Sequence, residues 1–318
     1  AVKKIIGEAI ESDETYRKKM LPEDDRCWTL VYAELAENIG LKLDVVPSVH
    51  EDTDGVMRLV IASVDYKYAK SAISITERIS KTYKWIPSNP EGFGVWFDEI
   101  NEPFLKMVLK EQKESIFKNY RSLFENSASV DDVPDFYVKS PLQRTIQLLK
   151  RHRDIYYYRN KAISEYRPAS IIITSLAAKV AKNTPALSLE ELLPHIVNGI
   201  ADYAILLQGK VPEAKVAGEE RNFIYKQESK WYIPNPVDPA DNYADSWSDE
   251  IAKAFFDWTE AVKRDLSETS CLNEMRYMAG LQTSFGKNYV DSKLGIKEQK
   301  SPCLQPRKIT QTSKPWGE

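Results

Sequence analysis

The stretch from Leu41 to Val49, which reads LKLDVVPSV, is the feature of this sequence that most constrains the fold. Its side chains alternate and then run apolar, it is rich in valine, and a proline ends it, so it predicts a short buried strand. Asp44 lies in mid-strand, where a buried carboxylate needs a metal, a cation or several hydrogen-bond donors. Two interpretations follow: an aspartate on the solvent face of an edge strand, or a functional carboxylate.

Neighbouring segments extend this sheet. Strands are predicted at 26–35 and 56–64, and the proline-rich stretch at 86–94 is typical of a loop. The polar segment His50–Gly55 contains a histidine and three acidic residues, Glu51, Asp52 and Asp54, but it lacks the distal glutamate of a calcium-binding loop. A solvated turn is therefore the favoured interpretation of this segment.

The second half of the chain is dominated by helical patterns. Ser140-Pro141 is typical of a helix start, because serine caps the first N–H groups and proline fits the first turn. The apolar positions that follow recur about every 3.6 residues. Four helices are predicted: one that begins at Ser140, and three that span 170–182, 189–207 and 250–266. The second has an almost wholly apolar first turn and is therefore expected to be central.

These patterns predict an α+β protein. A sheet-containing part at 1–125 precedes an all-helical domain at 126–292, with a polar, acidic, proline-containing stretch at 126–135 as the boundary, and a polar tail at 293–318. Clefts commonly form at such boundaries.

Charge is nearly balanced overall but uneven along the chain. There are 44 Lys and Arg against 47 Asp and Glu, a formal net charge of −3. Basic residues concentrate at 139–167 and acidic residues at 235–250. Such a distribution suits a small anionic ligand better than a long polymer, so stable binding of long nucleic acids is not expected; a solvated basic helix face is the alternative.

Apolar runs and cysteines bear on the compartment. The longest apolar run, Ile171–Ile173, is far too short for a bilayer crossing, so no membrane association is expected. The start of the sequence lacks the apolar core of a signal peptide. Three widely spaced cysteines without zinc spacing indicate reduced thiols and a cytoplasmic protein.

Five motifs in order resemble one family. They are LDVVP at 43–47, WIPSNPEGF at 85–93, SPLQ at 140–143 leading into QLLKRHRD at 147–154, PASIIIT at 168–174, and NPVDP at 235–239. This sequence resembles the bacterial CD-NTases, which are related to cyclic GMP-AMP synthase and oligoadenylate synthetase, from about Lys18 to Leu266. The resemblance implies a nucleotidyltransferase core of the polymerase-beta type with a mixed sheet.

The resemblance also implies a chemistry. These enzymes join nucleoside triphosphates such as ATP and GTP, with pyrophosphate leaving, into cyclic or linear oligonucleotide messengers of anti-phage defence, and some relatives act with a regulatory protein partner. Three strand carboxylates hold two Mg²⁺ ions, with Mn²⁺ as an alternative, and Asp44 matches the third carboxylate. Lys150 matches a lysine that contacts the triphosphate, and Ser170, at a helix N-terminus, suits the same phosphates. A surface lysine and a plain N-cap serine are the alternatives for these two residues.

One departure from the family pattern qualifies these roles. The family's Gly-Ser pair and Asp-x-Asp motif precede the strand that Asp44 occupies, and this sequence has neither there; Asp52 and Asp54 follow the strand instead. The expectation is a core that is N-terminally incomplete and a chain that is inactive as given. The alternative is a non-catalytic nucleotide-binding or scaffolding remnant of the same fold.

Overall fold

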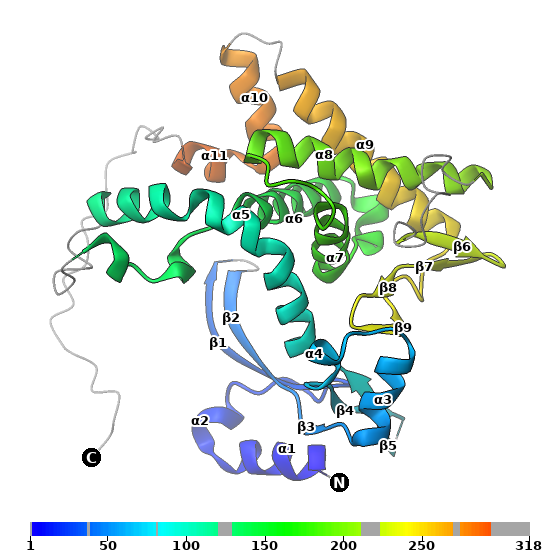
Figure 1. Cartoon of the computed structure of the whole chain (residues 1–318). Coiled ribbons are helices and arrows are strands. Elements are labelled where there is room, and N and C mark those ends of the chain that lie inside the picture. Colours follow the sequence, from blue (N-terminus) through cyan, green and yellow to red (C-terminus); the bar gives the residue numbers. More distant parts are fainter. Residues whose placement is uncertain are drawn as a thin grey trace, which may run out of the picture.

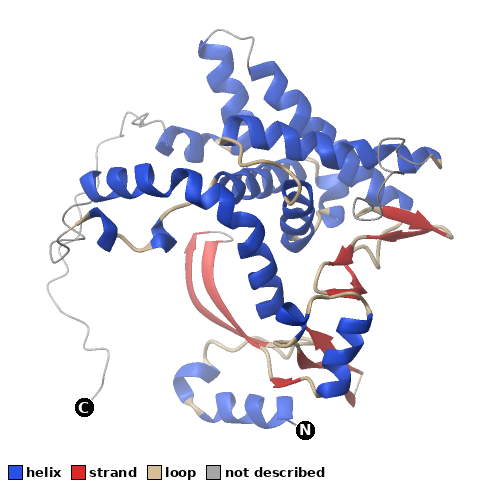
Figure 2. Cartoon of the chain, viewed as in Figure 1, coloured by secondary structure: helices blue, strands red, loops and turns tan. Residues whose placement is uncertain are grey.

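The computed structural model describes residues 2–36, 39–80, 82–119, 129–210, 223–269 and 274–293. A smaller part, which contains the longest strands, lies below a larger, mostly helical part in Figures 1 and 2. The predicted tail lies outside the described residues, apart from Lys293, and so does the beginning of the predicted boundary at 126–135.

The N-terminal part combines two antiparallel sheets with short helices. β1 (Trp28–Ala36) pairs with β2 (Ile39–Val45) and makes an isolated bridge from Leu30 to Met20, and the order β3-β4-β5 forms the second sheet. The described sheets are all antiparallel, so the mixed sheet that the family resemblance implied is not seen in them. The remaining elements of this part are α1 (Val2–Ser12), α2 (Glu14–Arg17), β3 (Ser48–His50), α3 (Thr53–Ile61), α4 (Tyr66–Ala69), β4 (Ile73–Ile79) and β5 (Thr82–Ser88).

The predicted strand at 56–64 is wrong, because this segment lies mainly in helix α3. The side chain of Asp52 accepts a hydrogen bond from the backbone N–H of Gly55 at 2.8 Å and caps the helix start. Leu59 is buried, with Val56 and Val60 packed against the same core, a helical spacing. A mostly apolar segment of this length is compatible with either a strand or a helix, and the cap decides in favour of the helix.

Helix α5 (Pro90–Asn119) joins the two parts (Figure 1). The loop predicted at 86–94 is wrong: β5 continues to Ser88, and the helix begins two residues later. The Asn89 side chain accepts a hydrogen bond from the N–H of Gly92 at 3.0 Å, and Pro90 lies in the first turn, where no N–H is needed.

The four helices predicted in the second part are confirmed, but the one predicted at 189–207 ends as an α-helix at Ala201 and is followed by a 3-10 helix at Asp202–Gln208. Ser140 and Gln143 form a capping box at the start of α6, and Ser188 and Glu191 form another at the start of α8. The helices are α6 (Pro141–Arg159), α7 (Ser170–Ala181), α8 (Leu189–Ala201), α9 (Asp249–Thr269), α10 (Glu274–Phe285) and α11 (Lys287–Lys293).

The expectation of an all-helical domain needs correction. Two small antiparallel hairpins lie between α8 and α9, formed by β6 (Tyr225–Gln227) with β7 (Lys230–Tyr232) and by β8 (Pro234–Asn235) with β9 (Asp238–Asn242). The side chain of Asn242 supports them by accepting from the N–H of Ile233 and donating to the carbonyl oxygen of Trp231, both at 2.8 Å. Local side-chain bonds of this kind order a proline-rich segment that has no clear periodicity.

The core is centred on α7, as predicted. Leu176, Ala177 and Ala178 are completely buried, and α7 packs against both α6 and α8. Small side chains at 177 and 178 let the neighbouring helices approach closely.

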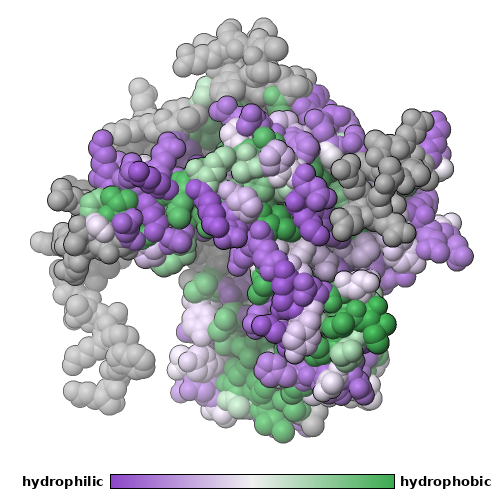
Figure 3. All heavy atoms as spheres, viewed as in Figure 1, coloured by the Kyte–Doolittle hydropathy of each residue, from purple (hydrophilic) through white to green (hydrophobic). Residues whose placement is uncertain are grey.

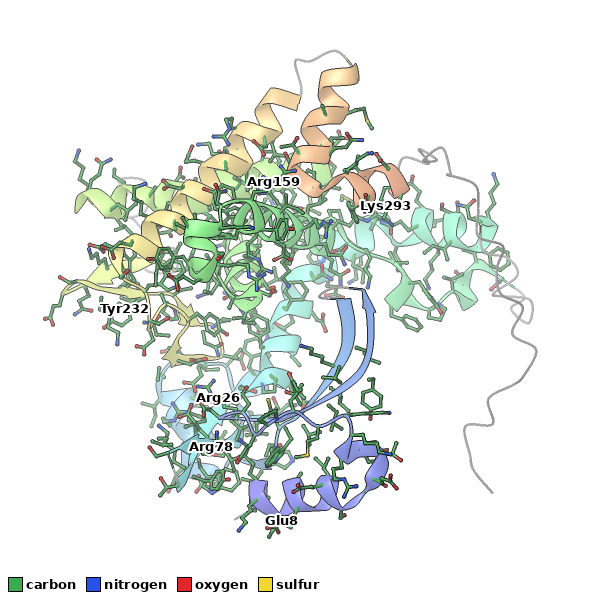
Figure 4. All side chains as sticks on the ribbon, turned by 180° about the vertical axis from the view of Figure 1, so that it is seen from behind. Glu8, Arg26, Arg78, Arg159, Tyr232 and Lys293 are labelled. Carbon is green, nitrogen blue, oxygen red and sulfur yellow. The ribbon has the colours of Figure 1, made fainter. Side chains whose placement is uncertain are left out.

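Polar contacts reinforce both parts. Arg58 of α3 makes a bidentate pair with buried Asp238 of β9, at 3.1 and 3.2 Å, and so ties the small part to the helical part. Figure 4 shows Arg26 and Arg78 close together in the small part, where Arg78 bonds to Glu23 at 3.0 Å. These ion pairs fix segments that are distant in sequence.

Apolar side chains also gather on the surface of the small part, over the region of α1 and α3 (Figure 3). Val2 and Ile5 of α1 and Met57 and Ile61 of α3 are among the exposed large hydrophobic residues. The described helices contain no stretch with the length and apolar character needed to cross a bilayer. Of the three cysteines, Cys27 is a free buried thiol, and the other two lie outside the described residues.

Candidate nucleotide-binding site

Arg153 organises the basic cluster that contains Lys150 and Ser170. Its buried guanidinium donates from Nη1 to the carbonyl oxygen of Pro168 at 2.9 Å and to the Ser170 hydroxyl at 3.1 Å. Its Nε and Nη2 donate to Asp154 at 3.0 and 2.7 Å. One side chain of α6 therefore fixes the start of α7 and places Ser170 beside the basic face of α6.

Lys150 lies one helical turn before Arg153 and is partly buried. Burial, together with the positive charge of Arg153, holds the pKa of Lys150 below its usual range. Within the described part of the chain, no carboxylate pairs with its ammonium group. A cation that is partly desolvated and faces another cation gains from an anionic ligand, since the ligand restores the lost electrostatic stabilisation.

The start of α7 adds hydrogen-bond donors to this cluster. Ala169 is the N-cap residue, so Ser170 is the first helical residue rather than the cap, and no side chain bonds to the first N–H groups. Ser170 is exposed, and its hydroxyl accepts from Arg153 while its proton stays available. Free N–H groups at a helix start favour a negative ligand.

The positioning role of Arg153 was not anticipated from the sequence. Its spacing from Ile146 and Leu149, by seven and four residues, places it on the apolar face of α6, and that signal could have indicated its burial. Asp154, its partner, also lies 3.7 Å from exposed Arg167. Lys150, Arg153 and Arg167 thus outnumber the one carboxylate among them.

Other basic and aromatic candidates have structural partners. Arg151 donates to the carbonyl oxygen of Phe285 at 2.8 Å and lies over the ring of Tyr289. Tyr157 and Trp231 are buried and bond to the Ala254 carbonyl oxygen and to Asp249. These contacts give Arg151, Tyr157 and Trp231 structural roles.

Asp44 lies on β2 of the small part, and the prediction that this strand is buried is wrong. It is exposed on β2, opposite Thr29 of β1, whose hydroxyl donates to its carboxylate at 2.6 Å. Leu41 and Leu43, on the other face of the strand, are 62% and 49% exposed, so both faces of β2 are open. β2 pairs with β1 alone among the described strands, so its other edge has no strand partner there.

The metal site implied by the family resemblance does not fit the described residues. No group of three or more histidine, cysteine, aspartate or glutamate side chains lies close enough there to hold a metal ion. Two Mg²⁺ ions shared between an attacking and a leaving oxygen require several carboxylates. Of the three strand carboxylates that the family resemblance implies, the described chain supplies Asp44 alone.

Comparison with known proteins gives two curated relatives, and no protein-family model matches the sequence. The c-di-GMP synthase of Roseivirga ehrenbergii is 29% identical over 248 residues, which cover 77% of this chain and 50% of that protein. The cyclic dinucleotide synthase CdnG of Bradyrhizobium diazoefficiens is 24% identical over 247 residues, 74% of this chain and 47% of that protein. The chain spans about half the length of the curated relatives it matches.

One relative is named as a c-di-GMP synthase and the other as a cyclic dinucleotide synthase, and this chain is similar to part of each. The chain is a relative of the CD-NTases, as its sequence motifs predict.

Proposed function

We propose that this chain belongs to a nucleotidyltransferase that joins nucleoside triphosphates, ATP or GTP among them, into a cyclic or linear oligonucleotide messenger. The observation that carries the proposal is the cluster of Lys150, Arg153 and Ser170, a partly desolvated basic site at the start of a helix in a relative of cyclic dinucleotide synthases. A cytoplasmic role in anti-phage signalling, with a regulatory protein partner, belongs to the same proposal.

Each residue of the cluster has a distinct part in phosphate binding. The Lys150 ammonium donates to a phosphate oxygen, and its charge compensates that of the triphosphate. The Ser170 hydroxyl and the first N–H groups of α7 donate to neighbouring oxygens. Arg153 acts as a positioning residue, since its own donors are occupied by Pro168, Ser170 and Asp154.

Asp44 is the proposed catalytic carboxylate, by its match to the family motif. The described residues do not assemble a two-ion site around it, so the proposed role of Asp44 includes no step through Mg²⁺ or Mn²⁺. Asp44→Asn is expected to abolish product formation in a form of the protein that turns over. Normal turnover by that variant would remove Asp44 from the proposal.

Binding to the cluster is tested directly with Lys150→Gln. Titration calorimetry with ATP and GTP is expected to show at least about tenfold weaker binding, since a charge-assisted bond to phosphate is lost. Lys118→Gln, at an exposed lysine near the end of α5, is the matched control and should leave the affinity unchanged. Equal affinities for Lys150→Gln and the control would refute the proposed site.

A second candidate function is favoured by the isolation of Asp44. A non-catalytic nucleotide-binding or scaffolding protein needs the Lys150 cluster but no metal site. It predicts that the chain binds nucleotides without releasing pyrophosphate. Release of pyrophosphate that depends on Asp44 would instead establish the enzyme.

A further inference from the structure

A second basic cavity lies at the opposite end of α7 from Ser170. It encloses about 300 Å³ between α5, the end of α7 and the segment of β8 and β9, and it is lined by Trp96, Lys179, Lys182, Asn183, Phe223 and residues of the 234–239 loop. A cavity of about 210 Å³ adjoins it and shares Trp96 and Lys182. Together they form a groove between the small part and the helical part.

The charge of the 300 Å³ cavity is unbalanced. Lys179 and Lys182 line it, and no carboxylate does so among the described residues. Two nearby carboxylates are paired with cations outside the cavity: Asp238 with Arg58, and Glu99 of the adjoining cavity with Lys67. Asp241 accepts from the Asn235 amide at 3.1 Å and does not line the cavity. The lysines therefore give this cavity a net positive charge.

Lys179 is the more constrained of the two lysines. Its Nζ donates to the carbonyl oxygen of Pro234 at 2.5 Å, which holds the ammonium group at the cavity wall. Burial lowers the pKa of Lys179 to about 8. A desolvated ammonium group with a carbonyl partner and no described counterion is stabilised when an anion enters the cavity.

The rest of the wall is mostly apolar. Pro234, Pro236 and Pro239 line it together with Trp96 and Phe223, and Asn183 and Asn235 add polar groups. Aromatic side chains and prolines next to ammonium groups match a ligand that has a flat apolar part and a charged part.

We propose that this cavity is a second binding site, for a nucleoside phosphate, with the phosphate on Lys179 and Lys182 and the base against the proline and aromatic wall. The volume lies at the lower end of the range for small-molecule sites, and the adjoining cavity extends the space available to a ligand. The choice of a nucleotide as the ligand rests on the proposed function. The cavity and its positive charge are observed independently of that function.

The two sites are separate. Lys179 and Lys182 lie nine and twelve residues after Ser170 along α7, so about 14 to 18 Å separates them along the helix axis. A ligand at Lys179 and Lys182 therefore occupies a regulatory position, and it is either a substrate triphosphate or a cyclic dinucleotide product.

Titration calorimetry with ATP, GTP, c-di-GMP and inorganic phosphate as separate probes tests the proposal on the whole chain. We expect the nucleotide that fits to bind at two sites per chain. Lys179→Met with Lys182→Gln should weaken one of them at least about tenfold, and Lys150→Gln should weaken the other. Triphosphate binding would indicate substrate sensing, and c-di-GMP binding would indicate product feedback.

The controls separate this site from simpler explanations. Lys118→Gln removes a lysine from the last turn of another helix, so it reports the effect of losing a charge at a helix C-terminus, and it should not change binding. Lys182 is exposed, so Lys182→Gln alone tests the site if the double variant does not fold. Inorganic phosphate should bind much more weakly than the nucleotide, because it cannot use the apolar wall.

The outcomes are distinguishable. One site that is lost in Lys150→Gln and unchanged in Lys182→Gln would overturn the second site and leave the proposed function intact. One site with the opposite dependence would support the second site and remove Lys150 from the proposed function. Equal affinity for inorganic phosphate would overturn the nucleotide assignment, and no binding by any probe would overturn both sites.

Discussion

Loss of the Arg58 guanidinium is predicted to destabilise the protein strongly, because it leaves a buried carboxylate without a partner. The Asp238 side chain is only 4% exposed, and both of its oxygens accept from Arg58, at 3.1 and 3.2 Å. Breaking a buried pair in this way costs ~3–5 kcal/mol. The Arg58 side chain is 41% exposed, so solvent screens part of the pair, and we expect about 2–3 kcal/mol for Arg58→Met.

Urea unfolding followed by tryptophan fluorescence measures this change. With a slope of about 3 kcal/mol per M, the midpoint should fall by about 1 M. Adding Asp238→Leu to Arg58→Met should recover much of the loss, since the unpaired charge is then removed as well. The double-mutant cycle isolates the coupling between the two residues.

Arg26→Met provides the matched control. Its guanidinium bonds to Glu77 at 2.8 Å, but the two side chains are 60% and 19% exposed, and such surface pairs contribute ~0.2–1 kcal/mol. A midpoint shift for Arg58→Met no larger than that for Arg26→Met would refute the idea that burial of Asp238 sets the cost.

Three further predictions concern the helical part. Burial tends to raise the pKa of Asp265, but hydrogen bonds led by that from His152 outweigh this and hold it below its usual range. The resulting stabilisation is present above the unfolded carboxyl pKa of about 4 and is lost as pH falls through the folded value, so the wild-type urea midpoint should fall more steeply in acid than that of Asp265→Asn. Ser140→Ala removes the cap of α6 and should cost about 1 kcal/mol, measured by thermal melting. Gly286 has φ +86° and a hypothetical Cβ only 2.8 Å from an Arg151 nitrogen, so Gly286→Ala should cost about 1–3 kcal/mol in the same melting assay; an unchanged Tm would contradict the strain.

Local signals in the sequence predicted four helices of the second part, α6 to α9, but not α10 and α11. Ser140 with Pro141 and Gln143 predicts where α6 begins because capping involves residues three positions apart. Apolar periodicity similarly predicts α7, α8 and α9. The motif order also indicated the CD-NTase relationship without any structural information.

The predictions of secondary structure were wrong where a segment lacked a decisive local signal. Residues 56–64 read equally well as strand or helix, and the Asp52 cap decides for α3. The 86–94 segment has the prolines of a loop, yet Pro90 occupies the first turn of α5. Residues 225–242 form hairpins that depend on the side chain of Asn242.

The functional residues also divide into those that the sequence indicated and those that only the structure revealed. Sequence motifs alone made Asp44, Lys150 and Ser170 candidates, because the residues of each motif are near each other in the chain. The folded chain was needed to see that Arg153 joins Lys150 to Ser170, that Asp44 is exposed, and that Lys179 lines a cavity. Burial, charge pairing and cavities depend on which elements pack together across tens of residues, and side-chain periodicity within one element carries no information about its neighbours.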